Sequence, residues 1–296
     1  MSAGKAELSG GRQLGPVDAL IFAPHPDDEV IGTAGVIQQL LERGKHVRVV
    51  FATNGDGSSK AASQLFRKAA ASLRDSDYVR LARRRQQEAI AADAKLGLSK
   101  PDLVFLGYPD AALAAVYANT GNDPVRSPTT GRTATYGPFE TDYHTLAHGR
   151  PAAYTRDAAL VDFGEVLGDS RATQVYVTDP ADQHPDHVAT YNFVHDALVA
   201  ASPHETLLTF LVHNGPGWPR PTGPTPDSQF ESLSVDGTVY PTGVTWPPPI
   251  RVPLDPGQST RKLAALDTVF SQIASQKDRL YLESFVKSEE VFWTRP

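Results

Sequence analysis

The chain has 296 residues, a net charge of −6 and no cysteine. Its length allows one large domain or two small ones with a substantial core, and its charge gives no electrostatic footprint for nucleic acid or anionic lipid. The absence of cysteine excludes disulfides, thiolate metal ligands and cysteine nucleophiles, so His, Asp or Glu must hold any metal. We therefore expect a small or neutral substrate rather than a polyanion.

The first half of the chain alternates predicted strands and helices. An apolar run at 18–23 predicts a buried strand, and apolar residues at helical spacing predict a helix at 29–43, followed by Gly44 at the C-cap. A second strand at 46–52 completes a βαβ unit. The elements predicted after it are a helix at 78–96, a strand at 103–106, a helix at 154–167, a strand at 174–178, a helix at 186–200 and a strand at 207–212. This alternation predicts an α/β layered fold with a mostly parallel sheet.

Two long stretches interrupt the alternation. Residues 118–150 are rich in Gly, Pro, Thr and Tyr without periodicity, and residues 214–257 hold eleven of the 24 prolines. Loops of this length in a compact domain are usually functional or disordered, although the aromatic residues of the second stretch indicate that it is packed. Residues 259–275 have a helical apolar face again. We expect one domain, 1–296, with two long loop insertions.

The sequence offers no membrane-spanning or targeting segment. No window approaches the roughly 18 consecutive apolar residues of a transmembrane helix. Residues 1–18 lack the apolar stretch of a signal peptide. We therefore expect a cytoplasmic protein, or a secreted one if a signal has been removed. The sequence does not indicate an oligomeric state.

The first chemically informative motif, Pro24-His-Pro-Asp-Asp-Glu29, lies between a predicted strand and a predicted helix. Such turns line the ligand-binding crevice of open α/β sheets. His25 and Asp28 are three residues apart, so a tight turn can direct both side chains at one point while Asp27 points elsewhere. A simpler interpretation is that acidic residues complement the dipole of the helix N-terminus, but it does not explain the histidine or the prolines.

The second motif, Gln183-His-Pro-Asp-His187, again lies between a strand and a helix. A lone surface histidine is more often a solvated side chain than a ligand. Two strand-end motifs of the same type indicate a shared site.

These residue types suit metal-assisted hydrolysis. A catalytic Zn²⁺ uses three protein ligands of nitrogen or oxygen type and leaves one position for water, whose pKa falls from about 15.7 toward 7. His25 and Asp28 of the first motif and a histidine of the second motif are the candidate ligands. Asp27 is the candidate general base. Two histidines with one carboxylate also bind non-haem Fe²⁺, so Fe²⁺ or another divalent metal remains an alternative to Zn²⁺.

His184 is the candidate for the second half of the reaction. Attack of water on an amide carbonyl creates an oxyanion and later a leaving amine. His184, held by a nearby carboxylate such as Asp186, could stabilise the first and protonate the second.

The two motifs resemble those of the PIG-L/LmbE-like family, named for N-acetylglucosaminyl-phosphatidylinositol de-N-acetylase. The resemblance rests on His25–Glu29 as the H-P-D-D-E motif and on His184–His187 as the H-x-D-H motif. Weaker matches are Thr53–Gly57, Arg85 with Glu88, Leu96-Gly97, Phe105–Asp110, Lys262 with Ala265-Leu266, and Ser271-Gln272. Together they cover roughly residues 17–213 and 260–293.

The resemblance implies a Rossmann-like domain and a Zn²⁺-dependent N-deacetylase acting on a GlcNAc-type amino sugar or glycoconjugate. The roles it implies are metal ligation for His25, Asp28 and His187, general base for Asp27, acid or oxyanion stabiliser for His184, orientation of His184 for Asp186, and sugar contact for Arg85 and Asp110.

Several side chains lie outside the two motifs. We hypothesise that aromatic residues of the insertions stack on sugar rings, with Tyr136, Tyr143, Trp218 and Trp246 as candidates. We interpret His46, His195, His204 and His213 as structural. His144 and His148, in the first insertion, could approach the site but show no ligand spacing.

Two other functions compete with deacetylation. Metal-dependent phosphoester hydrolysis also uses Asp and His at strand ends, but two-metal phosphoesterases need bridging carboxylates at a spacing that the sequence lacks. A non-catalytic glycan-binding protein of the same fold would need neither Asp27 nor His184.

Overall fold

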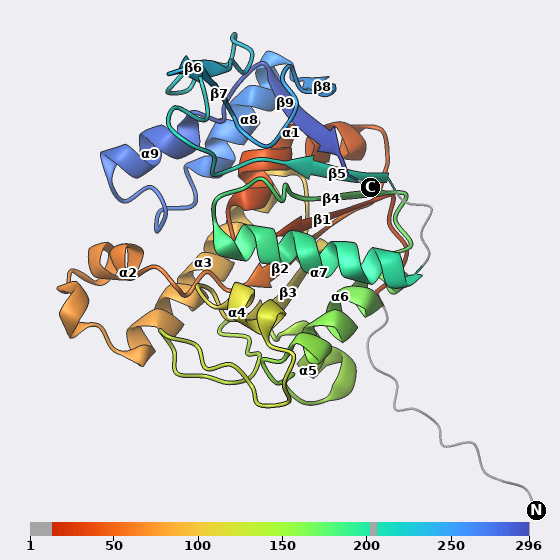
Figure 1. The fold of residues 1–296 in the computed structure, drawn as a ribbon, viewed down its shortest axis with the longest axis vertical. Coiled ribbons are helices and arrows are strands. Elements are labelled where there is room, and N and C mark those ends of the chain that lie inside the picture. Colours follow the sequence, from red (N-terminus) through yellow and green to blue (C-terminus); the bar gives the residue numbers. More distant parts are fainter. Residues whose placement is uncertain (1–13, 202–205, 296) are drawn as a thin grey trace, which may run out of the picture.

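A seven-stranded sheet with the order β3-β2-β1-β4-β5-β9-β8 runs through the computed structural model, which describes residues 14–201 and 206–295 (Figure 1). Its parallel strands are β1 (Ala19–Ala23), β2 (Val47–Thr53), β3 (Leu103–Tyr108), β4 (Gln174–Thr178) and β5 (Thr206–Phe210). β9 (Glu289–Thr294) and β8 (Ile250–Pro253) extend one edge in antiparallel fashion. The predicted Rossmann-like fold with a mostly parallel sheet is confirmed.

Helices cover both faces of the sheet (Figure 1). One face packs against α1 (Asp28–Glu42), α3 (Asp75–Leu96) and α8 (Pro256–Leu266). The other packs against α4 (Leu113–Ala118), α6 (Arg156–Ser170) and α7 (Pro185–Ala201). The remaining elements are α2 (Ser59–Phe66), α5 (Tyr143–His148), α9 (Gln276–Glu283), the hairpin β6 (Leu233–Val235) and β7 (Thr238–Tyr240), and two single-turn helices at Ala70–Ser72 and Lys100–Asp102.

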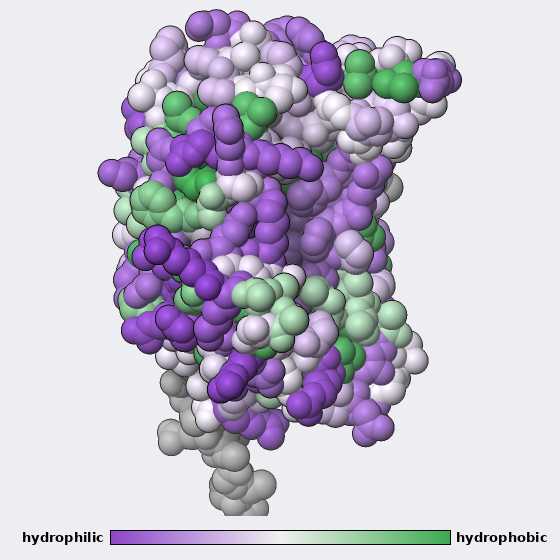
Figure 2. Space-filling view, turned by 90° about the vertical axis from the view of Figure 1, so that its left-hand side faces the viewer, coloured by the Kyte–Doolittle hydropathy of each residue, from purple (hydrophilic) through white to green (hydrophobic). Residues whose placement is uncertain are grey.

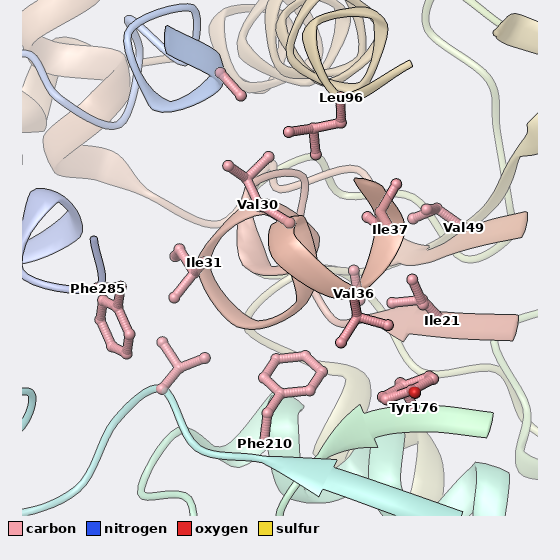
Figure 3. Packing of buried hydrophobic residues seen from close by; sticks show 14 of the residues in the cluster. Ile21, Val30, Ile31, Val36, Ile37, Val49, Leu96, Tyr176, Phe210 and Phe285 are labelled. Atoms are coloured by element: carbon pink, nitrogen blue, oxygen red, sulfur yellow. The ribbon is translucent and has the colours of Figure 1, made fainter. Parts of the chain in front are cut away.

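The core explains why β1 is apolar without interruption. Successive side chains of a strand point to opposite faces, and a parallel strand inside the sheet is covered on both. Ile21 packs with Val30 and Phe210 in one cluster, whereas Leu20 and Phe22 belong to the cluster on the opposite face. Figure 3 shows the first of these clusters around α1.

The strand order changes direction between β1 and β4. From β1 the chain proceeds through β2 to β3 on one side, and it then returns to place β4 and β5 on the other side. Ligands bind at this switch point in open α/β sheets, outside the carboxyl ends of the strands. The first motif directly follows β1, and the second lies in the connection from β4 to α7, so the fold brings them together there.

The predicted strands and helices are present with ends shifted by a few residues, but the segment 259–275 differs from its prediction. Its helix, α8, ends at Leu266. Beyond it, the backbone N–H and hydroxyl of Ser271 donate to the Glu88 carboxylate of α3. This contact holds the chain in turns that reach the site, although Val269 and Ile273 stay buried as the helical pattern indicated.

The two insertions contain more structure than loops. The first includes α5, and the second includes the β6–β7 hairpin and β8. Trp218 and Phe230 of the second insertion are buried in the core, which confirms that it is packed. Among the described residues, no helix combines the length and apolar character that a bilayer crossing requires.

Candidate metal centre

Three donor atoms converge at the switch point. His187 Nε2 lies 3.2 Å from His25 Nδ1 and 3.3 Å from Asp28 Oδ2, and the last two atoms are 3.3 Å apart. Tetrahedral ligands about 2.0 Å from a central ion are separated by about 3.3 Å from one another. The three side chains are buried and offer two imidazole nitrogens and one carboxylate oxygen, so they fit a Zn²⁺-type cation.

The turn after β1 aims two of these donors at one point. The backbone N–H of His25 donates to Asp28 Oδ2 at 2.9 Å, and the Asp28 N–H donates back to the His25 carbonyl. Between them Asp27 has a positive φ of 150°, an uncommon backbone conformation that is characteristic of functional sites. The sequence predicted that the Asp27 side chain points away from the common point of His25 and Asp28, and this backbone conformation accounts for the difference in direction.

Carboxylates outside the donor triad contact the two imidazoles. Asp182 Oδ2 lies 3.2 Å from His187 Nδ1 and accepts the backbone N–H groups of Val212 and His213. On the other side, Asp110 Oδ1 lies 3.2 Å from His25 Nε2. Carboxylates in this position fix the ring orientation of metal-ligating histidines and raise their basicity.

The electrostatics favour a cation. Burial alone would lower the pKa of His187, but the charges of Asp28 and Asp182 raise it to about 9. Burial would likewise lower the pKa of His25, and Asp110 with its neighbours instead raises it well above its ordinary value. Both shifts express a negative potential at the donors, which attracts a divalent cation.

Asp27 and Arg85 lie beside the donors and line the cleft. Arg85 Nη2 is 3.4 Å from each carboxylate oxygen of Asp27, and its Nη1 donates to the Gly55 carbonyl at 2.9 Å. Burial raises the pKa of Asp27 to about 7, although Arg85 opposes the shift. Gly55 allows this close approach, because a Cβ there would lie within 2.5 Å of the guanidinium carbon.

His184 also faces the cleft, but the predicted partner holds it differently. The backbone N–H of Asp186, not its carboxylate, donates to His184 Nδ1 at 3.3 Å. The Asp186 carboxylate instead accepts the N–H groups of Ala111 and Ala114 and lies 3.6 Å from His25 Nε2. Burial and two neighbouring histidines lower the pKa of His184 to about 4.

A cleft of about 380 Å³ opens above these residues between α2 and the segment from Ser271 to α9. Figure 2 shows a hydrophilic hollow on this face of the molecule. Lys60 of α2 pairs with Asp278 of α9 at 2.6 Å, and both side chains line the cleft. A pocket at the lower end of the usual ligand-binding range suits a group about the size of a monosaccharide.

The stacking hypothesis for the insertion aromatics is not supported by their positions, because none of the four lines the cleft. Trp218 packs on Phe230 in the core, and Trp246 packs against the same cluster. The hydroxyl groups of Tyr136 and Tyr143 donate to carboxylates elsewhere. Among the residues that the structure describes, Tyr281 of α9 is the aromatic side chain, apart from the histidines, that lines the cleft.

The other histidines separate into three groups. His213 was expected to be structural, but it lines the cleft, where the Tyr281 hydroxyl lies 3.0 Å from its Nδ1. His46 and His195 lie outside the cleft, as do His144 and His148 of α5, which do not approach it. The interpretation of His204 falls outside the described residues.

Sequence reasoning missed Asp182. The only signal was a carboxylate shortly after a strand and two residues before His184. We expect Asp182→Asn to weaken Zn²⁺ binding at the donor triad by about 10- to 100-fold, because the His187 ring loses the carboxylate beside it. Competition with a chromophoric chelator measures the affinity, and unchanged affinity would contradict the role assigned to Asp182.

The fold and the site define an α/β protein of Rossmann type with a histidine–carboxylate centre at its switch point. The chain belongs to the PIG-L family, described as GlcNAc-PI de-N-acetylase, whose sequence model matches residues 20–198. A comparison with curated proteins gives no match.

Solved structures share the fold at low sequence identity. A teicoplanin-pathway deacetylase triple mutant has a TM-score of 0.53 at 16% identity, over 93% of this chain and 96% of that chain. The N,N′-diacetylchitobiose deacetylase of Pyrococcus horikoshii has 0.51 at 18%, over 94% and 83%. The 4-carboxy-2-hydroxymuconate hydratase of Pseudomonas putida KT2440 has 0.52 at 17%, over 94% and 96%.

Proposed function

We propose that this protein is a divalent-cation-dependent N-deacetylase that hydrolyses the N-acyl group of a GlcNAc-type amino sugar or glycoconjugate. The observation that carries the proposal is the triad of donor atoms from His25, Asp28 and His187, mutually 3.2–3.3 Å apart, of which His25 and Asp28 line a cleft. Zn²⁺ suits the donor set best, and Fe²⁺ is the alternative.

The residues beside the triad divide the proton chemistry. A cation held by the triad supplies Lewis-acid activation of the attacking water and of the amide carbonyl. Asp27 takes the proton of the water, because a buried carboxyl with a pKa of about 7 is suited to general-base catalysis near neutrality. Arg85, 3.4 Å from Asp27, holds that carboxylate in place.

His184 completes the site beside the triad, with its ring centroid 4.8 Å from that of His25. Its Nδ1 accepts the Asp186 N–H, so the neutral ring carries its proton on Nε2. A pKa of about 4 keeps the ring neutral at pH 7, where it donates a hydrogen bond to the developing oxyanion. As the bond to the acyl group breaks, the leaving amine receives the proton that Asp27 took from the water.

The comparisons support this activity without identifying the substrate. The family is described by a GlcNAc-PI de-N-acetylase, and two of the solved structures bear the names of deacetylases. A hydratase has the same fold, so the fold alone does not identify the activity, and the residues of the site are the basis for the proposed reaction. A buried base and a hydrogen-bond donor beside a cation site favour amide hydrolysis over glycan binding alone.

The test is a product analysis with the full chain loaded with Zn²⁺. GlcNAc, N,N′-diacetylchitobiose and a generic phosphoester are incubated separately, and acetate, primary amine and phosphate are measured. We expect acetate and amine in equal amounts from a sugar substrate, with both lost on chelation. Phosphate alone would support a phosphoesterase, and no product from any sugar would contradict the proposed deacetylase.

A further inference from the structure

A second group of histidines and carboxylates lies between α5 and α6. His144 Nδ1 is 2.6 Å from Asp162 Oδ1, and His148 Nε2 is 2.8 Å from Glu165 Oε2. The two imidazole rings have their centroids 4.3 Å apart. One donor atom from each of His144, His148 and Asp162 lies within 4.8 Å of the other two. Small side-chain rotations are therefore enough to bring three donors around one ion.

The helices explain why these side chains meet. His144 and His148 are four residues apart on α5, and Asp162 and Glu165 are three apart on α6, so each pair lies on one helix face. The Asp142 side chain caps the start of α5, and Gly149 ends it in the left-handed conformation. The first histidine pair is thus fixed on a short, capped helix opposite the carboxylates.

The side chains of this group become more exposed from Asp162 outward to His148 and Glu165. The Asp162 side chain is fully buried and accepts the Tyr108 hydroxyl at 2.7 Å through Oδ2, which leaves Oδ1 facing the histidines. The His144 side chain is 12% exposed, whereas those of His148 and Glu165 are 34% and 37% exposed. The outer pair gives solvent access, and the Tyr108 contact orients the inner carboxylate.

We propose that His144, His148 and Asp162 bind a second divalent cation, with Glu165 oriented toward His148 as its carboxylate partner. Two imidazoles with one carboxylate suit Zn²⁺, Ni²⁺ or Cu²⁺ and not Mg²⁺ or Ca²⁺, which prefer oxygen ligands. The ligands join α5 of the first insertion to α6 of the layered core. The bound cation therefore acts as a staple between the insertion and the core.

This site is separate from the cleft. None of its four residues lines the cleft, and Figure 1 shows α5 and α6 apart from α2 and α9, which border the cleft. The inference consequently goes beyond the proposed deacetylase, and the two can fail independently.

Metal stoichiometry tests the proposal. The metal-stripped full chain is dialysed against micromolar Zn²⁺, and bound metal is measured for the wild type, His144→Ala/His148→Ala and His187→Ala. We expect about two ions per chain in the wild type and about one in each variant. His195→Ala is the matched control, because His195 also lies beside a carboxylate, Asp196, and should leave the wild-type stoichiometry unchanged.

Each outcome is decisive for one site. Two ions retained by His144→Ala/His148→Ala would overturn the staple and identify a pair of ordinary His–carboxylate contacts. A single wild-type ion that is lost only in His187→Ala would overturn it as well. A single ion lost only in His144→Ala/His148→Ala would support the staple and contradict the metal centre of the proposed deacetylase.

A second readout covers the case in which the double variant folds poorly. With Zn²⁺ about 100-fold above its dissociation constant, the thermal midpoint of His187→Ala should rise by roughly 5 °C. Adding His148→Gln to that chain should abolish the rise while leaving the midpoint in chelator unchanged. An equal rise in both chains would overturn the proposal.

Discussion

Replacing His187 by alanine is expected to remove the cation from the cleft and to lower deacetylation by about 10³-fold or more, because the reaction loses Lewis-acid stabilisation worth several kcal/mol. The imidazole is fully buried and contributes one of the three converging donors. Its loss also leaves Asp28 and Asp182 without their shared partner. We therefore expect a lower free energy of unfolding for the metal-free variant as well.

Metal analysis, product release and thermal melting measure the three effects on one sample. His195→Ala, at a partly exposed position of the same helix α7, is the control and should alter none of them. Because a second cation is proposed at α5 and α6, the comparison is best made in the His144→Ala/His148→Ala background. Full metal content and activity after loss of His187 would refute the ligand assignment.

Changing Asp27 to asparagine should lower kcat by about 10²- to 10⁴-fold, the usual contribution of a general base. Asparagine keeps the shape of the side chain but cannot take the proton of the attacking water. Since Asp27 is not one of the three donors, Zn²⁺ content should stay near that of the wild type. Steady-state acetate release with parallel metal analysis measures both quantities.

The split between kcat and KM distinguishes this role from a structural one. Loss of a group that acts only in the transition state lowers kcat and kcat/KM equally. Asp227→Asn, an exposed position in the second insertion, provides a matched control with no expected effect. A variant whose KM rises while kcat stays unchanged, or whose metal content falls, would show that Asp27 is not the base.

The parallel half of the fold could be predicted because its strands are buried on both faces and its helices have regular apolar spacing. β9 escaped prediction for a physical reason. It begins with two buried glutamates, and their partners, Lys262 and Arg251, are distant in the sequence. Without those partners in view, Glu289 and Glu290 do not look like the start of an inner strand.

The same distinction, between local sequence patterns and contacts distant in the sequence, separates the site residues that were predicted from those that were not. Donors from the two motifs were predictable because both motifs follow strands that a parallel sheet aligns. Asp182 and His213 reach the site through hydrogen bonds made only in the folded chain, and the place of Asp182 shortly before His184 was the one local signal for either residue. The sequence predicted that the Asp186 carboxylate orients His184, but the structure places this carboxylate beside His25. This difference also arises from contacts that are made only in the folded chain.

The ion pair between Lys60 and Asp278 spans the two walls of the cleft, and its Lys60 side chain is 56% exposed. Exposed pairs of this kind contribute only about 0–1 kcal/mol. This pair therefore adds little resistance to a separation of α2 from α9, and none of the three donor residues belongs to either helix. A wider entrance thus costs little at this contact and does not require the donor atoms beneath it to move.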